Sequence, residues 1–220
     1  MRSARDIATH SWYGYGRWSA DYWFIGMEPG GQDDLASYEA WLTLGGSELV
    51  DCRAHHMAHD DPAWTRWHLG DRPPTQPTWR RLIQLLLAFQ MKRADLNAVK
   101  DYQRQQWGSA TGETARIEVS AVHSPRLSRI DLNAPEIKSR LDVIHDRMLE
   151  FAPTFAVLYG IGYQHCYEQI IGTTFDSARF AQVGATLCAL TPGPTSARGK
   201  PWGRGEWWIE KGVEIRKRLS

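Results

Sequence analysis

The sequence predicts an α/β fold, a three-layer α/β/α arrangement around a mainly parallel, four-stranded central sheet. Short apolar runs rich in aromatic and β-branched residues alternate with longer stretches whose apolar residues recur at helical spacing. Turns rich in proline and glycine separate the two kinds of segment. Such alternation is typical of a parallel sheet with helices on both faces. A length of 220 residues suits one compact unit, so we expect a single domain over residues 1–220.

The elements follow in order. The first twenty residues show no clear period and are expected to form an irregular arm or a short helix. A buried strand over 22–26 stops at a Pro/Gly turn, and a helix over 35–44 follows, with Asp33 or Asp34 as a possible N-cap and Gly45-Gly46 at its end. A helical stripe of leucines predicts a helix over 78–90. Further along, we expect strands over 115–122, 155–159 and 185–190 and helices over 134–151, 160–171 and 206–219.

Residues 51–77 interrupt this pattern. The segment is polar, rich in histidine and tryptophan, and closed by three prolines. We expect a long excursion over the surface that serves as a lid or a pocket wall, because structureless loops of this length are uncommon without a function.

Composition excludes some classes of protein. Residues 1–22 contain no continuous apolar run, and no later segment is apolar for long enough to cross a bilayer, so we expect a cytoplasmic protein without a membrane partner. Cys52, Cys166 and Cys188 are far apart in sequence and are expected to be buried free thiols. The net charge of +1 hides an uneven distribution: residues 31–61 carry −6, whereas residues 191–220 carry +4. The second segment could therefore meet phosphates.

Glu28 is the first catalytic candidate. It follows the strand Trp23-Phe24-Ile25 directly, and in an open α/β sheet the carboxyl ends of the strands face the ligand crevice. Pro29 stiffens the turn, while Gly30 and Gly31 allow a substrate to approach the backbone. The alternative is a structural turn with a solvated glutamate.

The same residues carry a resemblance to a known family. Gly26-Met27-Glu28-Pro29-Gly30 resembles the first catalytic loop of the uracil-DNA glycosylase superfamily, and Thr191-Pro192-Gly193-Pro194 occupies the position of its last loop, with threonine where relatives have His or Asn. The segment 118–125 corresponds by position to the strand whose end contacts the base, and 135–172 has the family's helix, strand, turn and helix. The resemblance implies a uracil-DNA-glycosylase-like fold.

It also implies roles for residues. Glu28 would activate water and stabilise an oxocarbenium-like sugar in a flipped-out nucleotide. DNA would be the partner of a monomeric protein that needs no cofactor and no metal, and the lack of a lysine near the motif indicates a monofunctional glycosylase. The implied substrate contacts are Gly26, Met27, Pro29, Gly30, Gly31, Ser120, His123 and Thr191. The implied DNA contacts are Pro192, Gly193, Pro194, Thr195, Ser196, Arg198, Lys200 and Arg204.

Two departures from the family bear on the substrate. Gly30 stands where uracil-selective relatives carry a tyrosine that excludes groups at pyrimidine C5. Relatives specific for uracil also carry a base-reading asparagine on the middle strand, and the nearest positions here are Ser120 and Ala121. We therefore expect a modified pyrimidine, with α-glucosyl-5-hydroxymethylcytosine in phage DNA as the best candidate. Its removal would give abasic sites and serve anti-phage defence. The alternatives are a uracil or damaged-base repair glycosylase, a non-catalytic DNA-binding module of the same fold, and a hydrolase of free nucleosides.

Three other motifs are weaker. His55 and His59 are one helical turn apart, with Asp60 or His68 as a third metal ligand, but no two-ligand spacing is decisive and we expect pocket-wall donors or surface residues instead. Gly160-Ile161-Gly162 lacks the third glycine of a dinucleotide fingerprint, and no nucleophile elbow surrounds Ser124.

Overall fold

The computed structural model describes residues 3–27, 35–59, 61–70, 73–123, 131–195 and 199–220. These residues form a sheet of seven strands in the order β3-β1-β4-β2-β5-β7-β6. The four strands β4, β2, β5 and β7 run parallel to one another at its centre, while β1 is antiparallel to β4 and β6 is antiparallel to β7. The strand bounds are β1 (Gly14–Tyr15), β2 (Tyr22–Gly26), β3 (Leu49–Val50), β4 (Thr114–Glu118), β5 (Phe155–Tyr159), β6 (Phe180–Val183) and β7 (Thr186–Thr191).

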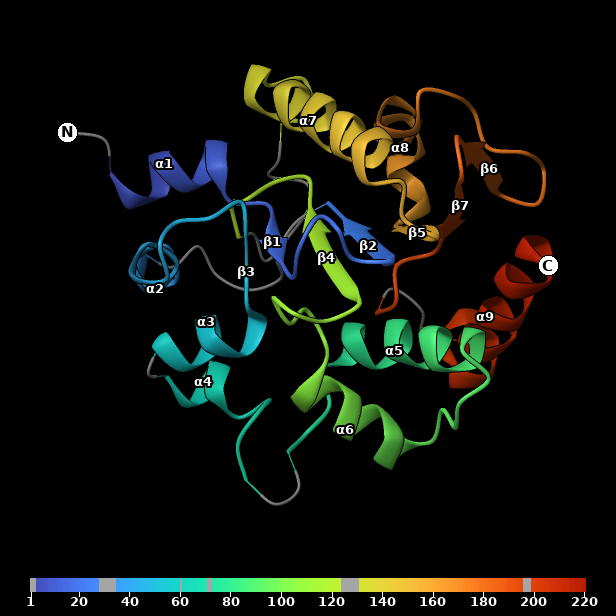
Figure 1. Cartoon of the computed structure of the whole chain (residues 1–220), viewed down its shortest axis with the longest axis horizontal. Helices are drawn as coiled ribbons and strands as arrows, with labels where there is room; N and C mark the ends of the chain where they lie inside the picture. The colour runs from blue at the N-terminus through green and yellow to red at the C-terminus, as the bar shows by residue number, and fades with distance from the viewer. Residues whose placement is uncertain (1–2, 28–34, 60, 71–72, 124–130, 196–198) are drawn as a thin grey trace.

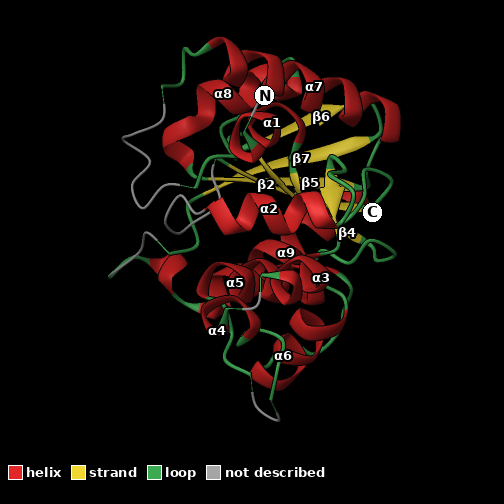
Figure 2. Cartoon of the chain, turned by 90° about the vertical axis from the view of Figure 1, so that its left-hand side faces the viewer, coloured by secondary structure: helices red, strands yellow, loops and turns green. Residues whose placement is uncertain are grey.

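Helices cover both faces of the sheet, so that the molecule has three layers (Figures 1 and 2). On one side lie α7 and α8, and on the other lie α5, α9, α6, α3 and α4. The helix bounds are α1 (Ala4–Ser11), α2 (Leu35–Thr43), α3 (Cys52–Ala58), α4 (Pro62–Thr65), α5 (Pro77–Phe89), α6 (Leu96–Gln105), α7 (Pro135–Phe151), α8 (Gln164–Ile171) and α9 (Gly205–Leu219), with short 3-10 turns η2 (Ile161–Tyr163) and η3 (Pro201–Gly203).

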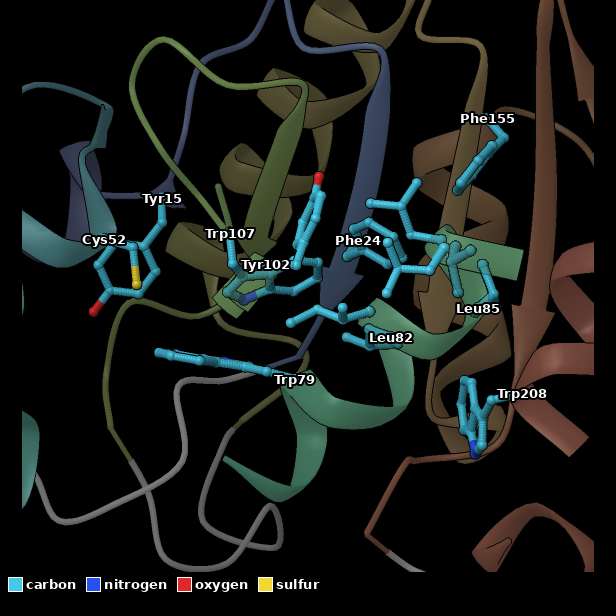
Figure 3. Close-up of a cluster of buried hydrophobic side chains, with 14 of the residues drawn as sticks. Tyr15, Phe24, Cys52, Trp79, Leu82, Leu85, Tyr102, Trp107, Phe155 and Trp208 are labelled. Carbon is cyan, nitrogen blue, oxygen red and sulfur yellow. The ribbon is translucent and has the colours of Figure 1, made fainter. Parts of the chain in front are cut away.

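Alternation along the strands divides the core in two. In β2, Phe24 packs with α5 and α9, whereas Trp23 and Ile25 pack with α7 and α8. Figure 3 shows the first of these cores, which runs from Tyr15 and Cys52 at one end to Trp208 at the other. Burial of this apolar surface on both faces is the main driving force that holds the layers together.

The α/β class is confirmed, and each of the four predicted strands is present. The predicted strand count is wrong, however, because the sheet has seven strands and is mixed. The sequence does not predict β1, β3 and β6, because strands of two to four residues are too short to show an alternation of apolar and polar side chains. All five predicted helices are present within a few residues of their expected bounds, whereas α3, α4 and α6 were not predicted.

The segment 51–77 is not merely a surface excursion. It contains α3 and α4, and it buries Cys52, His55, His56 and His68 against the rest of the chain. The expectation of three buried free cysteines is confirmed. Across the described ranges, no helix combines the length and the apolar character needed to cross a membrane.

Candidate functional site

The carboxyl ends of three neighbouring parallel strands meet at Gly26. This residue ends β2, with Glu118 of β4 beside it in register and Tyr159 at the end of β5 on the other side. Because Gly26 has no side chain, the Tyr159 hydroxyl reaches across it and donates a hydrogen bond to Oε1 of Glu118 at 3.3 Å. A Cβ atom on Gly26 would lie 2.3 Å from the Tyr159 hydroxyl and 2.7 Å from Glu118 Oε2. Only glycine fits at this position, because two polar side chains approach its Cα closely.

Glu118 is a buried acid at this edge of the sheet. Its carboxylate forms an ion pair with Arg116, and both side chains are almost fully buried. Burial raises the pKa of the Glu118 carboxyl to about 7, although the neighbouring guanidinium opposes the rise. Its Oε2 has no hydrogen-bond partner among the described residues. A carboxyl group with a pKa near neutrality can hold a proton and donate it at physiological pH.

Met27 is the last described residue before the predicted catalytic turn. The backbone amides of Val119 and Ser120 donate to the carbonyls of Gly26 at 2.9 Å and Met27 at 2.7 Å, which fixes the chain beside the end of β4. The predicted residues Glu28, Pro29, Gly30 and Gly31 lie outside the described residues, as do the proposed caps Asp33 and Asp34.

The two other sequence-predicted contacts on this side are buried. Ser120 is 4% exposed, and its hydroxyl accepts a hydrogen bond from the Val122 amide at 3.1 Å. His123 is 2% exposed, with Nε2 at 3.5 Å from the Ser37 hydroxyl and its ring packed against Trp12 and Trp64. The structure thus joins His123 to the N-terminal segment, α2 and α4.

Histidines of the 51–77 segment form a directed hydrogen-bond chain. The Ser37 carbonyl can only accept, so His55 Nε2 donates to it at 2.9 Å and His55 Nδ1 accepts from the Tyr15 hydroxyl at 3.1 Å. The Tyr15 oxygen then accepts from His56 Nε2 at 3.4 Å, and His56 Nδ1 accepts from His68 Nε2 at 3.1 Å. Burial lowers the pKa of His55 and of His68 to about 4, which keeps the chain neutral.

This histidine chain adjoins the buried ion pair. The Arg116 guanidinium lies over the rings of Tyr15 and Trp79, and His56 stacks on the same Trp79. Sequence reasoning grouped the histidines but had no signal for Tyr15 or Arg116, because the contact depends on how β1 and β4 pair. A small cavity of about 10 Å³ lies beside Glu118 and is lined by Trp12, Tyr13, Gly14, Tyr15 and Ala121; a volume of this size holds about one water molecule.

The predicted DNA-contact loop follows β7. Thr191 ends that strand and is buried, and its carbonyl accepts from the Gly160 amide at 2.8 Å. Pro192 and Pro194 are also buried and Gly193 is half-buried, whereas Thr195, Lys200 and Arg204 are exposed. Ser196 and Arg198 lie outside the described residues. Burial of the two prolines indicates that any DNA contact from this loop comes from its exposed second half.

A surface cavity accompanies the exposed part of the loop. It measures about 310 Å³ and is lined by Lys200, Arg204, Trp207 and the two acids Glu206 and Glu210. Close by, the Arg81 guanidinium donates to the Gly203 carbonyl at 2.7 Å. This contact brings the basic first turns of α5, with Arg80 and Arg81, to the basic loop. Sequence reasoning missed these two arginines because they belong to a helix predicted only for its apolar stripe.

A comparison with protein-family models gives no match, and a comparison with curated proteins gives none either.

Proposed function

We propose that this chain is a monofunctional DNA glycosylase that hydrolyses the N-glycosidic bond of a flipped-out modified pyrimidine. The observation that carries the proposal is the convergence at Gly26. The strand β2, which the motif Met27-Glu28-Pro29 follows in the sequence, lies among the central parallel strands, and a buried acid and a tyrosine flank its last residue. Ligands of open α/β sheets bind at such carboxyl ends.

The chemistry assigns complementary tasks to the two acids. Glu28 orients and deprotonates water and stabilises the positive charge that develops on the sugar. Burial holds the pKa of the Glu118 carboxyl at about 7. This carboxyl therefore keeps a proton available where negative charge develops on the departing base. Arg116 fixes the orientation of the Glu118 carboxyl through the contact between its guanidinium and Oε1.

The basic loop between β7 and α9 binds the DNA backbone. Lys200 and Arg204 are exposed, and Arg81 holds the same loop through the Gly203 carbonyl. Positive side chains of this kind bind phosphates without reading sequence. The family resemblance of the 26–30 motif supports a nucleotide in DNA as the substrate, and the glycine at position 30 supports a base with a bulky C5 group.

The substrate we propose is α-glucosyl-5-hydroxymethylcytosine in phage DNA, removed in the cytoplasm as an anti-phage defence. The test incubates the full chain with genomic DNA from phages that carry glucosylated, hydroxymethylated or unmodified cytosine, together with a uracil-containing duplex and free nucleosides. We expect abasic sites only in the glucosylated DNA, with the glucosylated base identified by mass spectrometry. Efficient cleavage of uracil DNA with intact glucosylated DNA would contradict the substrate, and binding of DNA without any base release would contradict the activity.

A further inference from the structure

The 51–77 segment brings three metal-ligating side chains together in the core. Cys52 and His56 are four residues apart on α3, so they share one face of that helix. His68 follows α4 and returns to the same place. One ligand atom from each of these three buried residues lies within 4.8 Å of the other two.

We propose that Cys52, His56 and His68 form a buried site for a divalent transition metal, with Zn²⁺ as the ion that this donor set favours. One thiolate and two imidazoles are typical zinc ligands, and they leave a fourth position of the tetrahedron open. In a tetrahedral zinc site the ligand atoms are roughly 3.3–3.7 Å apart, as bond lengths of about 2.0–2.3 Å require. Small side-chain rotations therefore suffice to close the observed cluster around an ion.

The hydrogen-bond chain orients His56 for this role. Because its Nε2 donates to Tyr15, its lone pair is on Nδ1, which faces His68 at 3.1 Å. A metal-bound histidine is usually held in this way, with the second ring nitrogen donating to an outer partner. His68 Nδ1 is buried and has no hydrogen-bond partner among the described residues. The His68 ring thus has a hydrogen-bond partner for Nε2 but none for Nδ1 among the described residues, as is expected of a metal ligand in the absence of its ion.

The charge balance is compatible with a cation. Without an ion, the His56 Nδ1 lone pair accepts from His68 Nε2–H. For both nitrogens to bind the ion, the His68 proton must move to Nδ1, which has no hydrogen-bond partner among the described residues. When the ion binds, the Cys52 S–H bond breaks, an S–metal bond forms, and the proton leaves to solvent. The Arg116 guanidinium, which lies over the rings of Tyr15 and Trp79 beside this cluster, is already paired with Glu118. The sequence pairing of His55 with His59 is not the one that the structure assembles, since His55 is engaged with Tyr15 and Ser37.

The test measures the metal content of the full chain, purified without a histidine tag after growth with zinc and then dialysed. We expect about one zinc per chain in the wild type and in two matched controls, Cys188→Ser in the other core and His10→Gln on the surface. Cys52→Ser and His68→Gln should each lose the ion. A wild type without zinc, or a Cys52→Ser protein that retains it, would overturn the site.

A spectroscopic measurement keeps the test independent of how well the variants fold. Cobalt(II) added to the metal-free wild type should give a thiolate-to-cobalt charge-transfer band in the near ultraviolet, which Cys188→Ser retains. Absence of that band in the wild type contradicts the site whatever the variants do. Glycosylase activity enters neither readout, so failure of the metal site and failure of the proposed function remain distinguishable.

Discussion

A single glycine separates the two polar side chains of the candidate site. Gly26 allows the Tyr159 hydroxyl and the Glu118 carboxylate to meet over the end of β2. Sequence reasoning chose Gly26 for its place in a motif, whereas the structure gives it a steric reason. Glu118 and Tyr159 were missed because they end two different strands, and only the strand register shows that they lie on either side of Gly26.

Gly26→Ala tests this close approach. The added methyl group meets two buried polar groups at less than 3 Å, and overpacking of this kind costs about 1–3 kcal/mol. We expect the free energy of unfolding, measured by urea denaturation, to fall by that amount. Gly162→Ala is the control, because a Cβ there meets nothing within 4 Å, and it should change stability by less than about 0.5 kcal/mol. Equal effects of the two substitutions would argue against a crowded site at Gly26.

Glu118 predicts a pH dependence with a definite sign. Its folded pKa of about 7 lies above the ordinary value of 4.5, so the protonated carboxyl contributes stability below pH 4.5 that is lost as pH rises to about 7. Glu118→Gln mimics the protonated form and does not titrate, so it is the reference against which the loss is measured. From pH 5 to pH 8 the wild type should lose up to about 3 kcal/mol relative to this variant.

The measurement is urea unfolding of both proteins across this pH range. Base release should follow the same titration in the wild type, with a fall above about pH 7, and should be insensitive to pH over that range in Glu118→Gln. A stability difference that stays constant, or that grows in favour of the wild type with rising pH, would show that Glu118 is ionised throughout.

Among helices and strands, the sequence predicts most accurately those that are long and have a clear apolar pattern. The apolar stripe of α5 and the short apolar runs of β2 and β5 predict the bounds of these elements within a residue or two. The 51–77 segment could not be predicted in the same way. His55, His56 and His68 are polar side chains, yet they are buried because Tyr15, Ser37 and Trp79 satisfy or cover their rings. Two of these partners, Tyr15 and Ser37, come from other elements earlier in the chain.

The loop between β7 and α9 predicts how DNA binding depends on salt. Lys200→Gln with Arg204→Gln removes two exposed positive charges. If both contact phosphates, the slope of log affinity against log salt should become shallower by about 2. The double variant Lys138→Gln with Lys217→Gln removes the same charge from exposed positions on α7 and α9 and should leave the slope unchanged. Fluorescence anisotropy with a labelled duplex gives both slopes, and an identical change in the two variants would mean that binding is not localised at the loop.

At the scale of the whole molecule, alternation of strands and helices predicted the α/β class and the four central parallel strands. The edges of the sheet were unpredictable, because β1, β3 and β6 are defined by pairing with longer strands rather than by their own sequence. The same limit applies to the site. Residues in a contiguous motif can be found from the sequence, whereas residues that converge through topology, such as Arg116, Glu118 and Tyr159, cannot.

The catalytic role of Glu28 is measured by the single-turnover rate of base release from glucosylated DNA by Glu28→Gln, with Glu39→Gln on the exposed face of α2 as the matched control. Loss of an acid–base group typically costs about 100- to 10,000-fold. We expect Glu28→Gln to release the base at least about 100-fold more slowly while it binds the same DNA as tightly as the wild type, and Glu39→Gln to match the wild type in both. A Glu28→Gln protein that releases the base at the wild-type rate would contradict the account.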